Sequence, residues 1–407
     1  MKILFFSECV TLAHLARPLV LAGAAVEAGH EVTIARSQAY AGIAAHYPFA
    51  SAPLESIAPR QFAAALASGS PLYDAATLER YVADDLRLIE HIKPDVVVGD
   101  FRLSLSVSAR LAGVPYTTLT NAYWSPYGTQ RYTVPTLPLT RFLPIGVADV
   151  LFNLARPFAF RYHALALNRV RQRHGLPSLG LDLRRVYTDA DTVLYVDHPA
   201  LFPLVGAPEN HRFIGPILWS PPGATPSWWD SLPPDRPIVY ATPGSSGHAG
   251  LLATVIDALA PLPVSIIAAS AGQATRLPAA PKLFLADYLP GTEAARRAAL
   301  VVCNGGSPTC QQALAAGVPV LGIPTNLDQF LNMAPIVATG AGALLRADRV
   351  DATTLRATAE RLLNTDPPRA AARTLAAQFR EYSAPERFLA SLPAAMGQRA
   401  TRNPVGD

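Results

Sequence analysis

Hydrophobic positions in the first third of the chain alternate between short apolar runs and longer segments with helical spacing. Runs such as Lys2–Phe6 and Asp95–Gly99 predict buried parallel strands. Leu12–Ala28 carries apolar residues every three to four positions and stops at Gly29, which is typical of a helix and its C-terminal cap. Strands that alternate with helices predict right-handed βαβ units and a parallel sheet covered by helices.

The alternation resumes after a segment rich in Pro and Gly, about Pro199 to Pro237. We therefore predict an α/β protein of two Rossmann-like, doubly wound domains that face each other across a cleft, where ligands meet the carboxyl ends of the strands. The expected parts are an N-terminal domain (1–205), a linker (206–236), a C-terminal domain (237–385) and a tail (386–407) that could pack back on the N-terminal domain.

Composition narrows the class of protein. The chain has 407 residues, of which 50% are hydrophobic and 16% charged, with a net charge of +4. These values exclude general disorder, and no basic cluster points to nucleic acid. The chain shows neither a long uncharged apolar run nor a leader pattern, and its three cysteines form no CxxC pair, so we expect a cytoplasmic protein without a spanning helix. Peripheral membrane contact, and a monomeric or homodimeric state, both stay open.

Two turns after predicted strands could bind phosphate. The first is Asn304-Gly305-Gly306-Ser307, where two glycines lead into a helix that Ser307 can cap. Free N–H groups at a helix N-terminus form an anion site, although the same pattern also suits an ordinary tight turn. The second turn holds Gly244, Ser245 and Ser246, and a flexible interdomain turn is the alternative there.

A third strand, Val318–Ile323, ends in a loop that bears Asp328 and Gln329. A carboxylate beside an amide can accept from and donate to vicinal hydroxyls, which suits a sugar. The alternative is that Asp328 caps a helix starting near Phe330.

Together these motifs resemble the signature of family 1 glycosyltransferases of GT-B fold, the UDP-glucuronosyltransferase and macrolide glycosyltransferase superfamily. The matching stretches are Gly305-Gly306, Thr309, Ala313–Pro319 and Asp328-Gln329, with Phe213–Pro216, Tyr240–Ser245 and Asp287–Pro290 also similar. The resemblance covers nearly the whole chain and is strongest in its C-terminal half.

The resemblance implies a role for each matched position. The donor diphosphate would be held by Gly244, Ser245, Ser246, Asn304, Gly305, Gly306, Ser307 and Thr309. Tyr288 would stack on the base, Gln312 would reach the ribose, and Asp328 and Gln329 would touch the transferred sugar. The sequence departs from the family at two of these positions: Asn304 stands where a histidine is usual, and Gln312 stands where a glutamate is usual.

Transfer with inversion needs a base for the acceptor hydroxyl, and histidine is well tuned for that task. His14 follows the first strand and resembles the family base, and Asp100, at the end of another strand, resembles the carboxylate that orients it. The alternatives are a histidine that bonds backbone at a helix start and an aspartate that caps a helix.

The sequence thus predicts an inverting, metal-independent glycosyltransferase that uses a UDP- or dTDP-sugar as co-substrate, with no further cofactor. Tyr123, Trp124 and the Pro135–Phe160 region, interpreted as a variable loop or else as core helix, would bind a hydrophobic small-molecule or lipid acceptor. A GT-B-like epimerase and a catalytically weak sugar-nucleotide binding protein are the alternative functions. The Asp189-Ala190-Asp191 triplet is interpreted as a solvated turn, and we expect no metal site.

Overall fold

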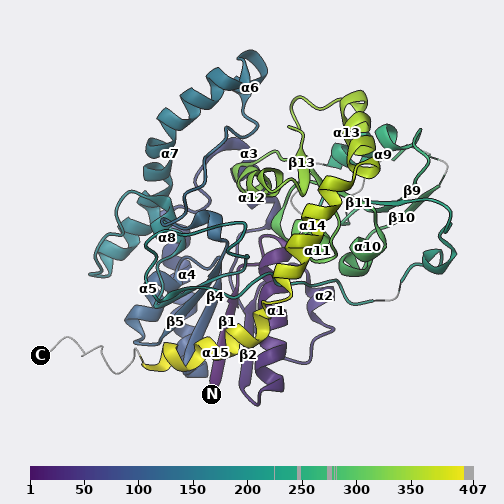
Figure 1. Ribbon diagram of the computed structural model, residues 1–407. Helices are drawn as coiled ribbons and strands as arrows, with labels where there is room; N and C mark the ends of the chain where they lie inside the picture. The colour runs from purple at the N-terminus through teal and green to yellow at the C-terminus, as the bar shows by residue number, and fades with distance from the viewer. Residues whose placement is uncertain (224, 245–248, 273–276, 279, 281, 398–407) are drawn as a thin grey trace, which may run out of the picture. The chain divides into compact units, whose positions relative to one another are not determined.

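The computed structural model describes all residues except 224, 245–248, 273–276, 279, 281 and 398–407. The chain forms two compact units (Figure 1). Unit 1 comprises residues 1–129, 154–217 and the chain from Tyr382 onward, and unit 2 comprises residues 130–153 and 218–381.

Unit 1 is built on a 7-stranded sheet with the order β3-β2-β1-β4-β5-β6-β7. Every neighbouring pair in this sheet is parallel. The strands are β1 (Lys2–Ser7), β2 (Glu31–Arg36), β3 (Ala50–Pro53), β4 (Val96–Asp100), β5 (Tyr116–Thr120), β6 (Thr192–Tyr195) and β7 (His211–Phe213). The chain moves outward in one direction from β1 to β3 and in the other from β4 to β7, so the topological switch point lies between β1 and β4.

Helices cover both faces of the unit 1 sheet. Phe5 packs in a core with α1 (Leu12–Glu27) and α15 (Ala384–Gly397), whereas Phe6 packs in a core with α4 (Ala75–Ile92) and α5 (Leu105–Leu111). Successive residues of β1 therefore serve opposite faces, as the period of a strand requires. The remaining elements before β7 are α2 (Ala41–Ala44), α3 (Pro59–Ser68), η1 (Ala122–Trp124), α6 (Pro138–Phe142), α7 (Ile145–Arg173) and α8 (Leu183–Tyr187).

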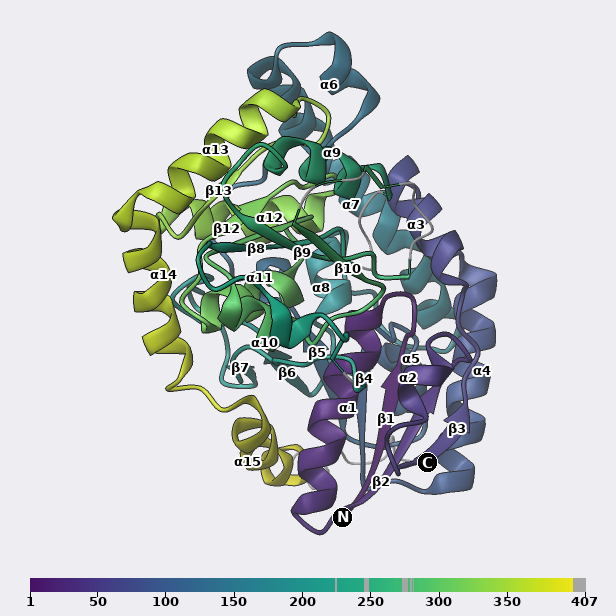
Figure 2. The same cartoon turned by 90° about the vertical axis from the view of Figure 1, so that its right-hand side faces the viewer.

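Unit 2 has a second parallel sheet, of six strands, with the order β10-β9-β8-β11-β12-β13. Its strands are β8 (Ile238–Thr242), β9 (Ser265–Ala269), β10 (Leu283–Ala286), β11 (Leu300–Cys303), β12 (Val320–Gly322) and β13 (Gly342–Leu344), and η2 spans Trp229–Ser231. Its helices are α9 (Ala249–Leu259), α10 (Gly291–Arg297), α11 (Ser307–Ala315), α12 (Leu327–Ala338), α13 (Ala352–Asn364) and α14 (Asp366–Phe379). Figure 2 shows α10 and α11 across this sheet from α9 and α13. Both units are thus Rossmann-like, as the sequence predicts.

The division of the chain differs from the expected boundaries. Residues 130–153 were expected in the N-terminal domain, but they belong to unit 2. Arg346 donates to the backbone oxygens of Val134 and Pro135 at 2.6 and 3.0 Å, and Thr136 N donates to Thr325 O at 2.8 Å. These contacts satisfy the backbone of a segment without strand partners of its own. The expected linker contributes β7 to unit 1 and Trp229 to unit 2, and α15 in the tail belongs to unit 1.

The Pro135–Phe160 region is helical rather than a variable loop. It contains α6 and most of α7, a helix of 29 residues that continues through Pro157. Pro138 stands in the first turn of α6, where a missing N–H is tolerated, and Pro144 lies between the two helices. Pro157 lies inside α7, and the helix continues past it.

Candidate active site

The first group of candidate residues lies at the switch point of the unit 1 sheet. Ser7, the last residue of β1, pairs with Asp100, the last residue of β4. The loop after β1 then leads into α1, and His14 lies in the first turn of that helix. Topology therefore brings together two side chains that are 86 positions apart in the sequence.

His14 and Asp100 are in direct contact. His14 Nδ1 lies 2.8 Å from Asp100 Oδ1, and the Asp100 carboxylate is fully buried while 16% of the His14 side chain is exposed. When Nδ1 carries the proton and donates it to Asp100, the lone pair of Nε2 is left to accept another proton. The His14 ring therefore contacts a carboxylate rather than the backbone at the start of α1. Asp100 does not cap a helix, because the N-caps of α1 and α5 are Thr11 and Ser104.

Arg17 completes this cluster, and sequence reasoning missed it. Its Nε and Nη2 donate to Asp100 Oδ2 and Oδ1 at 2.8 and 2.7 Å, and Nη2 also lies 2.8 Å from His14 Nδ1. A two-point contact of this kind fixes the plane of the carboxylate. Burial acts to lower the pKa of the Arg17 guanidinium, but the adjacent Asp100 outweighs it and the pKa is raised.

A polar chain connects Arg17 with the segment after β5. Arg17 Nη1 donates to Asn121 Oδ1 at 3.0 Å, and Asn121 Nδ2 lies 3.1 Å from Asp197 Oδ1. Asp197 Oδ2 in turn accepts from Ala122 N, the first residue of η1, at 2.6 Å. This chain of hydrogen bonds thereby fixes the position of η1, which holds Tyr123 and Trp124, relative to Arg17 and Asp100.

Aromatic side chains from several elements gather beside His14. The Phe101 ring is stacked on the His14 ring with 5.0 Å between centroids, and Phe101 has a positive φ of 59°. Such a backbone is uncommon for a bulky residue and is concentrated at functional sites. The cluster continues through Phe62, Tyr73 and Tyr187, and Trp124 meets Tyr187 edge-on.

The two expected acceptor residues differ in their surroundings. Trp124 is half-buried and contacts Phe160 and Tyr187 of this cluster. Tyr123 is only 1% exposed and packs on Phe202, so its ring serves the core.

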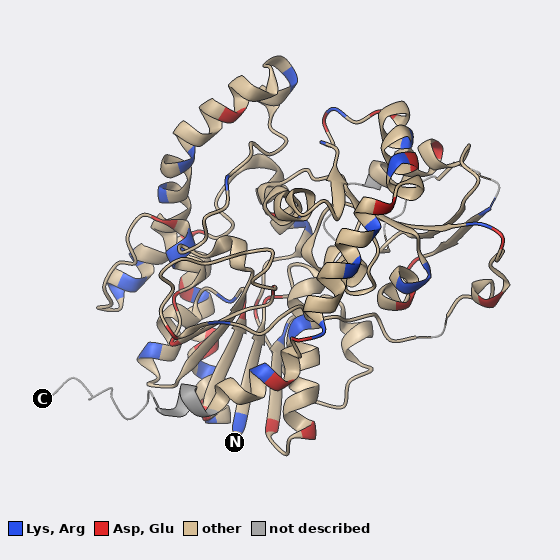
Figure 3. Ribbon diagram, in the orientation of Figure 1, with Lys and Arg blue, Asp and Glu red and all other residues tan. Residues whose placement is uncertain are grey.

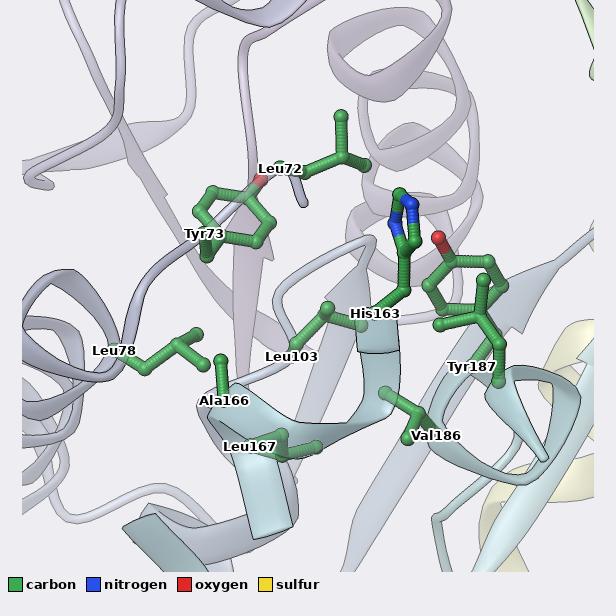
Figure 4. Close-up of a pocket in the computed structure, with 10 residues that line it drawn as sticks. Leu72, Tyr73, Leu78, Leu103, His163, Ala166, Leu167, Val186 and Tyr187 are labelled. Carbon is green, nitrogen blue, oxygen red and sulfur yellow. The ribbon is translucent and has the colours of Figure 1, made fainter. Parts of the chain in front are cut away.

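A small apolar pocket adjoins the aromatic cluster (Figure 4). Tyr73 and Tyr187 line it together with side chains of α4, α7 and α8, and Figure 4 shows His163 between them. Burial lowers the pKa of His163, although its contact with the backbone oxygen of Gly69 opposes that shift. The pocket suits an apolar group.

A buried ionic network supports the loop before His14. Arg102 is 1% exposed and pairs with Glu8 at 2.8 Å and with Asp85 at 2.9 Å. Tyr81 donates to Glu8 at 3.1 Å, and its ring lies 3.8 Å from the Arg102 guanidinium carbon. Burial raises the pKa of both carboxyl groups, although Arg102 opposes that shift. The network holds Glu8 in place and with it the segment that leads to His14.

The second group of candidate residues lies at the switch point of the unit 2 sheet, between β8 and β11. Asn304 follows β11, and its Oδ1 accepts from Gly306 N at 3.0 Å. Gly244 follows β8, and a Cβ on it would lie 3.2 Å from Asn304 Nδ2, so the two turns meet. Gly305 has a φ of +80°, and a Cβ there would lie 2.7 Å from Met333 Cγ.

The cap of α11 differs from expectation. Gly306, not Ser307, is the N-cap, and Ser307 and Pro308 are helical, because the turn ends one residue earlier. Its N-cap, Gly306, makes no side-chain cap hydrogen bond, and the N-terminus of a helix is a general site for an anion. Thr309 is half-buried in the first turn. Ser245 and Ser246 lie outside the described residues.

The two residues expected to bind the nucleoside differ in exposure: Tyr288 is exposed, and Gln312 is buried. Tyr288 is 41% exposed, and its hydroxyl lies 2.9 Å from a Cβ built on Gly272. Its ring is thus available for stacking. Gln312 is 8% exposed, donates to Trp219 O and packs against Gly291, so its amide N is engaged by backbone.

Asp328 and Gln329 lie in the first turn of α12. Asn326, not Asp328, caps this helix, and it forms a capping box with Gln329. Gln329 Oε1 accepts from Thr325 N at 2.8 Å, while Gln329 Nε2 is buried and has no hydrogen-bond partner among the described residues. A buried amide donor without a partner costs free energy and marks a place for a ligand oxygen.

The Asp189-Ala190-Asp191 triplet is structural rather than a solvated turn. Asp189 pairs with Arg110 and Arg171 at 2.7 and 2.8 Å, and Asp191 accepts from Tyr116 N at 2.9 Å. Within the described residues, no group of three or more His, Cys, Asp and Glu side chains could hold a metal ion.

The comparisons with known proteins agree with this arrangement. Residues 253–393 match the family described as "Erythromycin biosynthesis protein CIII-like, C-terminal domain". Over 378 residues the chain is 48% identical to the "PGL/p-HBAD biosynthesis glycosyltransferase" of Mycobacterium tuberculosis, which covers 93% of this chain and 88% of the relative. The chain belongs to the GT-B macrolide glycosyltransferase family. Its enzyme class, glycosyltransferase, is confirmed by these relatives.

Other members of this family differ in their named activity. A "PGL/p-HBAD biosynthesis rhamnosyltransferase" of Mycobacterium bovis is also 48% identical over 378 residues, covering 93% of this chain and 84% of the relative. An "Inactive PGL/p-HBAD biosynthesis glycosyltransferase" of the same species is 46% identical over 258 residues, covering 63% of this chain and 70% of the relative.

Solved structures show the same GT-B fold. "Spinosyn Rhamnosyltransferase SpnG" matches with a TM-score of 0.70 and 22% identity over 97% of this chain and 100% of that chain. The "glycosyltransferase VinC in complex with DTDP" matches with a TM-score of 0.68 and 19% identity over 98% of this chain and 100% of that chain. The predicted fold class is thus confirmed.

Proposed function

We propose that this enzyme transfers a sugar, with inversion and without a metal ion, from a nucleoside diphosphate to a hydroxyl of an apolar acceptor. The observation that carries the proposal is the contact of 2.8 Å between His14 Nδ1 and Asp100 Oδ1 beside an aromatic pocket. In the reaction His14 Nε2 takes the proton of the acceptor hydroxyl. The oxygen of that hydroxyl forms a bond to the anomeric carbon of the sugar. The bond from that carbon to the diphosphate breaks, and the nucleotide leaves with the electron pair.

Unit 2 would bind the donor. The N-terminus of α11 would hold the diphosphate, because the helix dipole favours the charge that the diphosphate develops as it leaves. Tyr288 would stack on the base, and Asp328 and the Nε2 group of Gln329 would bind sugar hydroxyls. We propose a thymidine diphosphate deoxysugar, because one relative is named a rhamnosyltransferase and a solved neighbour is complexed with DTDP.

The acceptor would be a hydrophobic molecule, such as a phenol, a polyketide or a lipid. Support comes from the ring of Trp124, the stacked Phe101 and the apolar pocket, which lie around His14 and Tyr187. The alternative function is a sugar-nucleotide binding protein with weak catalysis. The inactive relative and Asn304, which stands in place of a histidine, favour this alternative. The paired His14 and Asp100 support transfer instead.

A transfer assay with dTDP-rhamnose and UDP-glucose, on a panel of phenolic and lipid acceptors, tests the proposal. We expect His14→Ala and Asp100→Ala to lower kcat by about 100-fold or more, because general bases contribute about 10²–10⁴ to rate. Stabilisation by dTDP in thermal melts should persist in both variants, since the nucleotide binds unit 2. EDTA should leave the rate unchanged.

The exposed His46, in the turn after α2, has its ring Nδ1 2.9 Å from the backbone oxygen of Gly42, and His46→Ala provides the matched control. Unchanged transfer in His14→Ala and Asp100→Ala would refute the mechanism. Turnover of donor without acceptor at the same rate would instead indicate an epimerase.

A further inference from the structure

A stripe of large apolar side chains runs along the solvent face of α7. It consists of Val147, Val150, Leu151, Leu154, Phe158 and Tyr162, and we refer to it as the α7 stripe. Leu154 and Phe158 are 67% and 74% exposed, and the neighbouring Phe142 of α6 is 84% exposed. Single apolar residues are common on surfaces, but a contiguous patch indicates an interaction site.

Helix geometry places these side chains on one face. At about 100° per residue, the members of the α7 stripe fall within about 120° of the helix circumference, over about 22 Å of length. Ala148, Phe160 and Ala164, on the other side of α7, are buried. The helix thus buries one face in the protein and exposes a second apolar face to solvent, contrary to the usual polar outer face.

The charges around the α7 stripe are all positive. Arg161 is exposed and falls within the same sector of the helix, and Arg141, on the preceding α6, is also exposed. Asp149, the acidic residue between positions 141 and 173, is 8% exposed and bonds Arg131 and Val134 N. Figure 3 shows the charged residues of α6 and α7. An anionic partner complements this surface, whereas a two-fold contact between copies would bring like charges together.

The inner face of the same helix reaches the aromatic cluster. Phe160 contacts Trp124 with 6.2 Å between ring centroids, and His163, Ala166 and Leu167 line the apolar pocket. One helix therefore presents apolar side chains both to solvent and to the pocket. Among the described residues no helix is long and apolar enough to cross a membrane, so any contact of α7 with lipid would lie in the interface.

We propose that the α7 stripe docks on the surface of a bilayer that contains anionic lipid. Leu154, Phe158 and Tyr162 enter the boundary between headgroups and acyl chains, while Arg141 and Arg161 bind lipid phosphates. The inference goes beyond the proposed function, because it concerns the surface of α7 and is measured without turnover.

Vesicle sedimentation tests the docking. We expect the full chain to bind vesicles of phosphatidylglycerol and phosphatidylcholine more tightly than vesicles of phosphatidylcholine alone, with binding weakened by salt. Leu154→Ser with Phe158→Ser should reduce binding by at least tenfold, and Arg161→Gln should reduce it about fivefold on the anionic vesicles alone. Val205→Ser, at a residue 68% exposed elsewhere on unit 1, is the matched control and should bind normally.

A second measurement reports insertion directly. Phe158→Trp should show a blue-shifted emission and quenching by brominated lipid when anionic vesicles are added, whereas Val205→Trp should show neither change. Equal binding by the wild type and the Leu154→Ser, Phe158→Ser variant would overturn the proposal. A wild-type dimer in sedimentation equilibrium that becomes monomeric in that variant would also overturn it, since a second copy would then cover the stripe.

Discussion

Arg17 and Asp100 form a two-point ion pair in which Nε and Nη2 donate to the two carboxylate oxygens at 2.8 and 2.7 Å. Arg17 is 8% exposed and Asp100 fully buried. Nη2 and the Nδ1–H group of His14 both donate to Asp100 Oδ1, so the guanidinium orients His14 through the carboxylate that the two side chains share. We assign Arg17 a positioning role, because it holds the carboxylate that orients His14.

Arg17→Lys should lower kcat by about tenfold or more and leave the donor KM nearly unchanged. Lysine keeps the positive charge but cannot make the planar two-point contact that holds Asp100. Steady-state kinetics with varied donor check this result, with dTDP melts as the test of folding. Full activity in the lysine variant would show that Arg17 acts only as a countercharge.

Asn304→His should weaken nucleotide binding, although histidine is the usual family residue. Asn304 is 3% exposed, accepts from Gly306 N and lies against Gly244, so a larger ring would displace the turn. We expect a loss of about 1–2 kcal/mol, or a few degrees in Tm, with a reduced dTDP shift. Asn364→His, at an exposed site on α13, is the control. Tighter dTDP binding in Asn304→His would contradict the fit of the amide.

Trp124→Ala should raise the acceptor KM by at least tenfold and leave the donor KM unchanged. The ring contacts Phe160 and Tyr187 beside the proposed acceptor pocket, and buried aromatic contacts carry much of binding energy. Kinetics with varied acceptor make the measurement. Trp228→Ala in unit 2 should leave the acceptor KM as it is, and a donor-specific defect in Trp124→Ala would place this ring elsewhere in the reaction.

His211 should make the stability of unit 1 depend on pH. Burial lowers the pKa of His211 to about 4, below the value near 6.5 of an unfolded chain. Between these values the unfolded state binds more protons, so stability is lost as the pH falls from 7 to 5. His211 is only half-buried, and we therefore expect a contribution of about 1 kcal/mol.

Urea unfolding of the wild type and His211→Gln at pH 7 and pH 5 measures this contribution. The variant should lose about 1 kcal/mol less than the wild type over that interval. An equal loss in both proteins would show that His211 is protonated equally in the folded and unfolded states.

Local patterns could predict the strands and the residues at their ends. β1 and β4 are continuous apolar runs, and the rule that ligands meet the carboxyl ends of parallel strands selects His14, Asp100 and Asn304. The same rule applied to β5 and β6 would also have found Asn121 and Asp197. Arg17 stands three positions after His14, a spacing that puts both on one helix face.

Other features depend on contacts between distant segments, which no local pattern encodes. The aromatic cluster combines Phe62 of α3, Trp124 of η1 and Tyr187 of α8 with Phe101 of the loop after β4. The loop interpretation of Pro135–Phe160 was wrong and its helical alternative is confirmed; the outer face of α7 is apolar and lacks the polar half of an amphipathic pattern. The sequence predicts that Gln312 binds the ribose, but in the structure its amide nitrogen donates to Trp219 O.

The assignment of residues 130–153 to unit 2 also governs how the enzyme can be recombined. A hybrid that joined residues 1–217 to the donor half of another transferase would carry Val134 and Pro135 without the Arg346 that binds their backbone oxygens. The native donor half, expressed from position 218, would lack residues 130–153 altogether. Exchange of sugar specificity by swapping halves therefore requires four crossover points, placed near 130, 153, 218 and 382, so that the C-terminal helix comes from the first parent.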